Sequence, residues 1–403
     1  MNKKKAIKKI IDKVIEKLFT ISGATTSIVI VFICIFLFKE GVGLFKTPTV
    51  EQGYGLFVNS KNTVEQLSPE QIKQLFDGEI SNWKTVGGPQ KDIKLLRVDD
   101  IFAIYPESEM GENFELLPEK LKEQLVKEEN AIGFFPLEFA PTGAAIKQLP
   151  TDHLKWKDFF FGKEWLPTAT PSPLFGALPL IYGTLLVSLF ALIIAVPLGL
   201  GVAIYLSELA TERQRKIMKP IIELLAGIPS VVYGFFGLVV LAPLIQKTFN
   251  LPSGETAFTG SVLLAIMALP TIISVAEDAM RNTPRAMKEA SLALGATHWQ
   301  TIYRVIIPYS KSGIMAAIVL GIGRAIGETM AVLMVTGNAA IIPHSLFDSV
   351  RTIPATIAAE LGEAPAGGAH YQSLFLLGCI LFVITMLISI TSELISKKTH
   401  KAH

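Results

Sequence analysis

Long apolar runs, separated by charged segments, dominate this chain. The first covers residues 18–38. At about 1.5 Å per residue it is long enough to cross a ~30 Å hydrocarbon core. The five further runs lie at 180–207, 220–245, 258–280, 312–336 and 371–392. The pattern therefore predicts six transmembrane helices.

Lys and Arg are distributed unevenly between the two ends of these predicted helices. The basic stretches are residues 1–17, 208–219, 281–311 and the C-terminus. By contrast, segment 246–257 has only Lys247 as a basic residue and segment 337–370 only Arg351. Because basic loops stay in the cytoplasm, the bias predicts that both termini are cytoplasmic.

Residues 46–158, between the first two apolar runs, differ in character and are rich in Lys, Glu and Asp. Strands are predicted at 53–59 and 93–98, and helices at 68–78 and 117–130. Ser68 and Gln71 have the spacing of a capping box at the start of the first helix. The topology places this segment outside the cytoplasm as a small α/β insert.

Composition supports a membrane protein. Half of the 403 residues are apolar and 18% are charged, which is unusually little charge for a soluble protein of this size. Cys34 and Cys379 both lie in apolar runs and have no CxxC partner, so neither a disulfide nor a metal site is expected. The predicted parts are 1–45 with the first helix, the insert at 46–158, and a helical core at 159–403.

The charged segment 283–308 has the features of a docking surface. It begins a helix at Thr283 and Pro284, and small residues and Gly295 follow. A short helix pair broken at a glycine could enter a groove on a partner protein. An amphipathic helix lying on lipid headgroups is the alternative, and the spacing alone favours neither.

Arg324 and Glu328 lie inside the apolar run 312–336. Being four residues apart, they would share one helix face and could pair. An ionised side chain at the centre of a membrane costs about 2.5–3.5 kcal/mol and normally faces protein or water. A translocation path is favoured over a purely structural pair, and an Arg fork suits an oxyanion.

Two stretches closely resemble the PstC-type permeases of bacterial phosphate ABC importers: GIGRAIGETMAVLMVTGN at 321–338 and the apolar segment 175–209. Segment 283–308 also resembles the coupling motif of ABC permeases, E-A-A, then Gly, then I-x-L-P. In this chain Ser291, Val305 and Ile307 depart mildly from that motif.

The resemblance implies an all-α polytopic membrane protein with six transmembrane helices of ABC importer permease type. It also implies phosphate as substrate, a PstA-type second permease, two copies of a cytoplasmic ATP-binding subunit and an extracytoplasmic phosphate-binding protein. The residues implied to couple to the ATPase are Glu289, Ala290, Gly295 and Pro308.

The chain contains no GxxxxGK[ST] motif, so ATP hydrolysis is expected in another subunit. We predict a transport subunit of the inner membrane rather than an enzyme. No catalytic residue, metal, cofactor or nucleic-acid partner is expected.

The insert resembles part of a phosphate-binding protein. The sequence after its second strand, RVDDIFAIYPES, lacks the Ser-Gly pair of a phosphate-contacting loop. Arg97, Asp99 and Asp100 are the only candidate ligands there, and surface charge is the favoured explanation for them. We expect a docking lobe without a complete phosphate site.

The sequence fits other functions less well. Arg324 alone does not separate phosphate from sulfate, molybdate or a phosphonate. A membrane sensor would need a cytoplasmic signalling domain, for which the loops are too short. An ion-driven carrier would be expected to show inverted repeats, and an intramembrane enzyme lacks a triad because His298 and His344 lie in loops.

Overall fold

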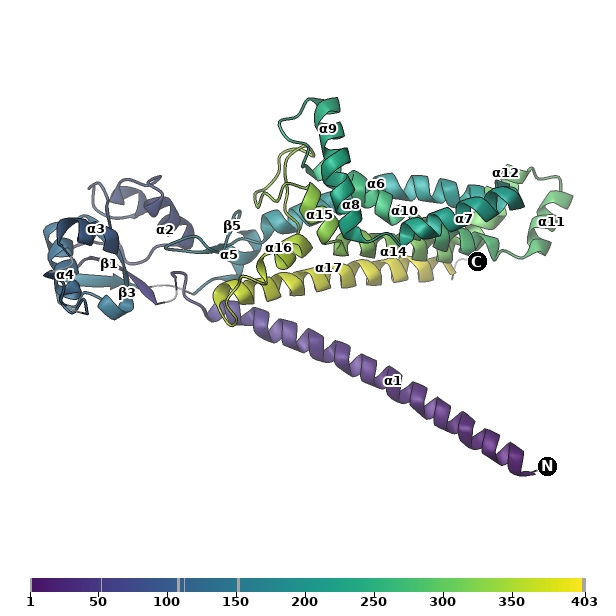
Figure 1. Cartoon of the computed structure of the whole chain (residues 1–403), viewed down its shortest axis with the longest axis horizontal. Helices are drawn as coiled ribbons and strands as arrows, with labels where there is room; N and C mark the ends of the chain where they lie inside the picture. Colours follow the sequence, from purple (N-terminus) through teal and green to yellow (C-terminus); the bar gives the residue numbers. More distant parts are fainter. Residues whose placement is uncertain (1, 52, 107–108, 112, 151–152, 401–403) are drawn as a thin grey trace.

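The computed structural model describes residues 2–51, 53–106, 109–111, 113–150 and 153–400. The molecule is elongated (Figure 1). The insert lies at one end, a bundle of long helices occupies the middle, and helices α11 (Arg285–Ala293) and α12 (His298–Thr301) lie at the other end. Both chain termini point away from the insert.

The helical core is built mainly from long helices. They are α1 (Asn2–Val42), α6 (Leu178–Ile204), α7 (Glu212–Ala226), α10 (Ala257–Arg281), α14 (Lys311–Gly327) and α17 (Ala369–His400). Shorter helices are α8 (Ser230–Phe236), α9 (Ala242–Phe249), α13 (Ile307–Tyr309), α15 (Met330–Val335) and α16 (Ile353–Glu360). Within the described residues, five helical stretches are long and apolar enough to cross a membrane, and six if one bent pair counts as a single span.

Two predicted spans have different boundaries in the structure. The run 220–245 is divided, because α7 ends at Ala226 and the next helix begins at Ser230, after Pro229. The resulting apolar span is Ser230–Phe249. Helix α7 begins with a Thr211 capping box and is amphipathic and basic, so it belongs to the charged connection rather than to the span.

The run 312–336 is also not one helix. Helix α14 stops at Gly327, Glu328 is extended with ψ 132°, and α15 begins at Met330. A second break precedes α14, where the stretches His298–Tyr309 and Lys311–Gly327 meet at 72°. The apolar pattern therefore predicted the span but not its breaks.

Helix α10 is the centre of the bundle and packs against both α6 and α14. Its fully buried Ile272 lies between two glycines, Gly199 of α6 and Gly321 of α14. A Cβ at either glycine would lie 2.8 Å from the Ile272 side chain. The absence of a side chain at both positions thus allows the three helices to approach closely.

Helix α1 diverges from the rest of the bundle (Figure 1). Near its C-terminal end it packs on α17, where the rings of Phe36 and Phe375 meet edge to face at 5.5 Å. Farther from this contact its large apolar side chains are exposed, as at Leu18 and Phe32.

The insert is a small α/β domain, as predicted. Its strands are β1 (Tyr54–Asn59), β2 (Lys94–Arg97), β3 (Ala131–Pro136) and β4 (Ile146–Leu149), in the order β2-β3-β1-β4. Its helices are α2 (Pro69–Phe76), α3 (Val98–Ile104) and α4 (Leu117–Lys127). The predicted capping box of Ser68 and Gln71 is confirmed. Each sheet face has its own apolar core, one around Trp83 and one around Phe135.

A short connecting region joins the insert to the bundle. It contains α5 (Trp156–Phe161) and the antiparallel strands β5 (Trp165–Leu166) and β6 (Leu174–Phe175). We call residues 162–176 the junction hairpin. At its base, Gly162 and Gly176 lie so close that a Cβ on Gly162 would be 2.7 Å from the Gly176 Cα.

Two glycines on different sides of α14 should differ in how well they tolerate a larger side chain. Gly321→Val would overpack against Ile272 and should destabilise the protein by about 1–3 kcal/mol. Gly323→Val is the matched control, because a Cβ there has no atom within 4 Å. Thermal unfolding of the detergent-solubilised protein should show a lower Tm for the first variant only. Equal Tm values would contradict this account of the packing.

Candidate functional site

Arg324 lies in the last turn of α14, just before the helix break. Its Nη1 donates a hydrogen bond to Oγ1 of Thr271 on α10 at 3.3 Å, and its side chain is half-buried. Its charge also acts on the nearby Tyr233 of α8. The guanidinium thus lies where three apolar helices meet.

The predicted i,i+4 pair between Arg324 and Glu328 is not formed. Among the described residues no ion pair within 4.0 Å joins them. The helix ends at Gly327, so Glu328 leaves the helix face that it would otherwise share with Arg324. Its carboxylate instead accepts a hydrogen bond at 3.4 Å from the N–H of Ala331, in the first turn of α15.

The break therefore separates the two charges. Arg324 keeps guanidinium donors that no carboxylate in the described part of the chain occupies, because its hydrogen-bond partner there is the hydroxyl of Thr271. A half-buried cation of this kind can bind an anion without first breaking an ion pair.

We call residues 283–308 the coupling loop. Its predicted short helix pair is present as α11 and α12, but α11 begins at Arg285 rather than at Thr283. Thr283 is buried instead, and its hydroxyl lies 3.1 Å from that of Ser310. This contact closes the base of the loop.

Gly295 ends α11 in a left-handed conformation, with φ 82°. The Gly295 N–H donates to the Leu292 carbonyl, and the Ala296 N–H donates to the Ser291 carbonyl. This pair of hydrogen bonds is the Schellman arrangement, which favours glycine. Open space surrounds Gly295, so its backbone conformation rather than its packing requires a glycine.

Polar contacts fix the coupling loop to the bundle. Lys288 of α11 forms a 2.6 Å ion pair with the buried side chain of Glu208, in the π-helical turn (Tyr205–Leu209) that follows α6. The hydroxyls of Ser291 and Thr301 lie 3.0 Å apart and hold the two short helices together. A displacement of the loop would therefore be transmitted to the long helices.

The outer surface of the coupling loop is accessible. Glu289, Ala290, Gly295 and Pro308, the predicted coupling residues, are all exposed. The most exposed large apolar side chains between them in sequence are Leu294 at 89% and Trp299 at 60% exposure. Neither was predicted from the sequence as a functional residue, although both are large apolar side chains inside a charged segment. Exposed apolar side chains with a polar surround are typical of a protein interface.

An ion cluster next to the loop was also missed. Glu277 of α10 is 1% exposed and pairs with Arg215 and Lys219 of α7, the latter at 2.8 Å. Burial alone would lower the pKa of Lys219, but hydrogen bonds to Glu277 and Asp278 hold that pKa above its ordinary value. A buried carboxylate without these partners would be costly, so the cluster fastens α7 to α10.

The candidate phosphate ligands of the insert do not converge. The Arg97 N–H donates to the Asp100 carboxylate at 2.7 Å, and the Arg97 guanidinium lies 5.7 Å from the Phe76 ring centroid. Asp99 is exposed in the first turn of α3. These contacts stabilise a helix start rather than a ligand site. In the described residues no group of three His, Cys, Asp or Glu side chains could hold a metal ion.

These features define a class: a polytopic helical membrane protein with an internal cation and an exposed loop of two short helices at one end. A family model described as the binding-protein-dependent transport system inner membrane component matches residues 195–401. That match covers just over half of the chain, which therefore belongs to this family.

The similar proteins include permeases of known class. The chain is 40% identical over 241 residues to the probable ABC transporter permease protein YqgH of Bacillus subtilis, covering 60% of this chain and 78% of the relative. It is 44% identical over 249 residues to the phosphate transport system permease protein PstC of Mesorhizobium japonicum, covering 57% and 75%. The prediction of a transport subunit rather than an enzyme is confirmed by these permeases.

Solved structures include a chain of the inward-facing MetNI methionine ABC transporter, with a TM-score of 0.44 and 18% identity. That match covers 54% of this chain and 93% of the other.

Gly295 provides a test of the coupling loop. A Val at this position must adopt a positive φ, which is unfavourable for a β-branched residue, so Gly295→Val should disturb the end of α11 and uncouple ATP hydrolysis from transport. Gly295→Asn is the matched control, since Asn tolerates the left-handed region. In reconstituted liposomes, uptake per ATP hydrolysed should fall for Val and stay near wild type for Asn. Wild-type coupling in the Val variant would contradict the prediction.

Proposed function

We propose that this chain is the permease subunit of an ATP-driven importer of inorganic phosphate. The observation that carries the proposal is Arg324, a half-buried cation among apolar helices with a hydroxyl rather than a carboxylate as its partner. Its guanidinium suits a tetrahedral oxyanion. Relatives named as phosphate permeases, at 44% identity and below, support phosphate over other oxyanions.

In this proposal the helix break is part of the pathway. Phosphate would bind at the junction of α8, α10 and α14, where Arg324 and Thr271 offer donors. Glu328, held at the start of α15, would lie near the anion and disfavour its prolonged stay. A transport site must bind strongly enough to admit the ion and weakly enough to release it.

ATP hydrolysis would be coupled to transport through the coupling loop. A cytoplasmic ATP-binding subunit dimer would bind its exposed surface, with Leu294 and Trp299 in the interface. The predicted coupling residues on that surface are Glu289, Ala290, Gly295 and Pro308. The Lys288–Glu208 pair would pass its movement to α6. A PstA-type permease would supply the second half of the path, and an extracytoplasmic phosphate-binding protein would deliver the ion.

The orientation follows from charge. Residues 208–219 and the coupling loop are basic and would be cytoplasmic under the positive-inside rule. The N- and C-termini lie toward the same end of the molecule (Figure 1), so both would be cytoplasmic as well. The insert would then lie outside the cytoplasm as a docking lobe.

The first experiment tests the substrate contact. Arg324→Ala should abolish phosphate uptake by the assembled transporter while leaving its assembly intact, because the side chain makes one weak hydrogen bond in the bundle. Thr271→Val is the companion variant, and it should reduce uptake only partly. Purified complex yield measures assembly, and radiolabelled phosphate measures uptake. Unchanged uptake by Arg324→Ala would remove Arg324 from the path, and uptake of sulfate or molybdate instead of phosphate by the wild type would change the substrate.

A second experiment concerns the insert, whose two apolar cores belong to it alone. Isothermal titration of residues 46–158 with phosphate should show no tight binding, because Arg97, Asp99 and Asp100 do not face a common site. Arg97→Ala is the control for any weak signal. Tight binding that this variant abolishes would overturn the docking-lobe assignment.

A further inference from the structure

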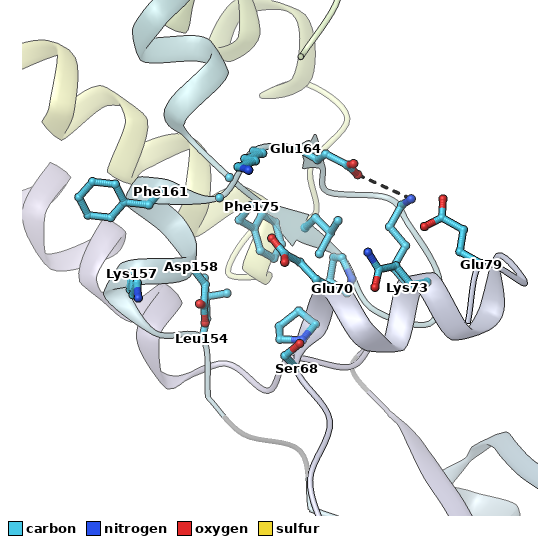
Figure 2. Close-up of a pocket in the computed structure, with 17 residues that line it drawn as sticks. Ser68, Glu70, Lys73, Glu79, Leu154, Lys157, Asp158, Phe161, Glu164 and Phe175 are labelled. Carbon is cyan, nitrogen blue, oxygen red and sulfur yellow. Dashed lines mark ion pairs between the residues drawn. The ribbon is translucent and has the colours of Figure 1, made fainter. Parts of the chain in front are cut away.

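The junction hairpin contacts the insert and the bundle through two consecutive residues. Glu164 extends toward the insert, where its Oε2 lies 3.6 Å from Nζ of Lys73 on α2 (Figure 2). Trp165 is buried on the bundle side, and its indole N–H donates to Oε2 of Glu360 at 3.0 Å. A change in the position of the hairpin would therefore alter its contacts with both the insert and the bundle.

Glu360, the last residue of α16, has three polar partners from different parts of the chain. Besides the hydrogen bond from Trp165, its carboxylate accepts one from Nη1 of Arg351 at 2.6 Å. It also lies 2.9 Å from Nε2 of His370, at the start of α17. Its side chain is 14% exposed. Burial alone would raise the pKa of Glu360, but His370, Trp165 and Arg351 hold it below its ordinary value. The carboxylate is thus ionised at neutral pH and binds all three partners.

Arg351 links this node to the candidate pathway. The preceding residue, Val350, donates its N–H to the carbonyl of Thr336 at 2.9 Å, directly after α15. Helix α15 begins at the break that holds Glu328. A continuous set of contacts therefore runs from the insert, through the hairpin and Glu360, to the short helix beside Arg324.

The contact at the insert has room to change. A cavity of about 460 Å³ separates α2 from the hairpin, and its lining includes Ser68, Lys73, Asp158 and Glu164 (Figure 2). Lys73 also pairs with Asp77 at 2.8 Å, on its own helix. The Glu164 side chain is 47% exposed, and ion pairs of this kind are weak. The Lys73–Glu164 pair can therefore open and reform, whereas the Glu360 node is largely buried.

We propose that Glu360 is a positioning residue that couples the insert to α15, so that the placement of the insert regulates access to the Arg324 site. This inference rests on the proposed function, because the regulated step is transport. The Lys73–Glu164 pair is the contact that can change, and the junction hairpin connects the insert to Glu360. An extracytoplasmic protein that moved the insert would then shift α15, and so alter access to Arg324, without contacting α15 itself.

The functional test uses charge reversal in the full assembled transporter. Lys73→Glu and Glu164→Lys should each lower phosphate uptake at least about fivefold, a typical size for a coupling between sites. The double variant restores an opposite-charge pair and should recover uptake to near wild type. Lys84→Glu, an exposed lysine of the same domain, is the matched control and should have no effect. A double variant no better than the two singles would overturn the role of this pair.

The structural test needs no transport. Glu360→Gln keeps the size of the side chain but removes the charge that binds Arg351. Hydrogen exchange of the full complex should become faster in the junction hairpin and in residues 336–352, and should stay unchanged in α4 of the insert. Glu363→Gln, at an exposed acid three residues on, is the control. Faster exchange in the hairpin alone, or in neither segment, would overturn the coupling.

The two tests separate the two proposals. A wild-type complex that takes up no phosphate, but whose exchange responds to Glu360→Gln in both segments, would refute the phosphate function and support the coupling. If the wild type takes up phosphate and the Lys73→Glu and Glu164→Lys variants take it up equally well, the coupling is refuted and the phosphate function is not. Poor folding of Glu360→Gln would leave the charge-reversal cycle to decide.

Discussion

The backbone break at Gly327–Thr329 is the constraint on which the rest of the bundle depends. Within hydrocarbon an irregular backbone is tolerated only where protein or a water-filled cavity surrounds it. Here α15 packs on α8, where Gly234 lies so close that a Cβ would be 3.0 Å from the Cα of Ala331. Ser188 of α6 also reaches the carbonyl of Ala325 at 3.4 Å. Helices α6 and α8 thus pack against the segments on the two sides of the break, while Gly327 at the break itself is exposed. The break also separates Arg324 from Glu328.

The sequence predicted well what local patterns determine. The length of each apolar run was enough to locate the transmembrane spans. The capping-box spacing of Ser68 and Gln71 was enough to predict that α2 begins at Pro69. Gly295 could be recognised from the sequence as a break between two short helices, because a glycine commonly ends a helix. These predictions succeeded because each depends on residues within a few positions of one another.

What the sequence did not predict depends on contacts between distant residues. The segment Gly327–Thr329 contains no proline, and its glycine is a weak signal because Gly321 and Gly323 lie inside α14 without ending it. The packing of α15 against α8 decides the break, and these helices are far apart in the chain. The partners of Glu277 and Glu360 were missed for the same reason, since Arg215 and Trp165 come from remote segments. Predicting the ion pair of Arg324 and Glu328 required a continuous helix, and that assumption was wrong.

The two ends of the insert meet where it leaves the bundle. Pro48 pairs with His153 as an isolated antiparallel bridge, and the Leu154 N–H donates to the Thr47 carbonyl at 3.4 Å. A domain whose first and last residues are neighbours occupies no more of its host than a short loop would. Such a domain can be gained, lost or exchanged as one genetic cassette while the helices on either side keep their packing. Chimaeras that carry a different lobe between residues 48 and 153 are therefore a practical route to transporters that answer to a different external partner.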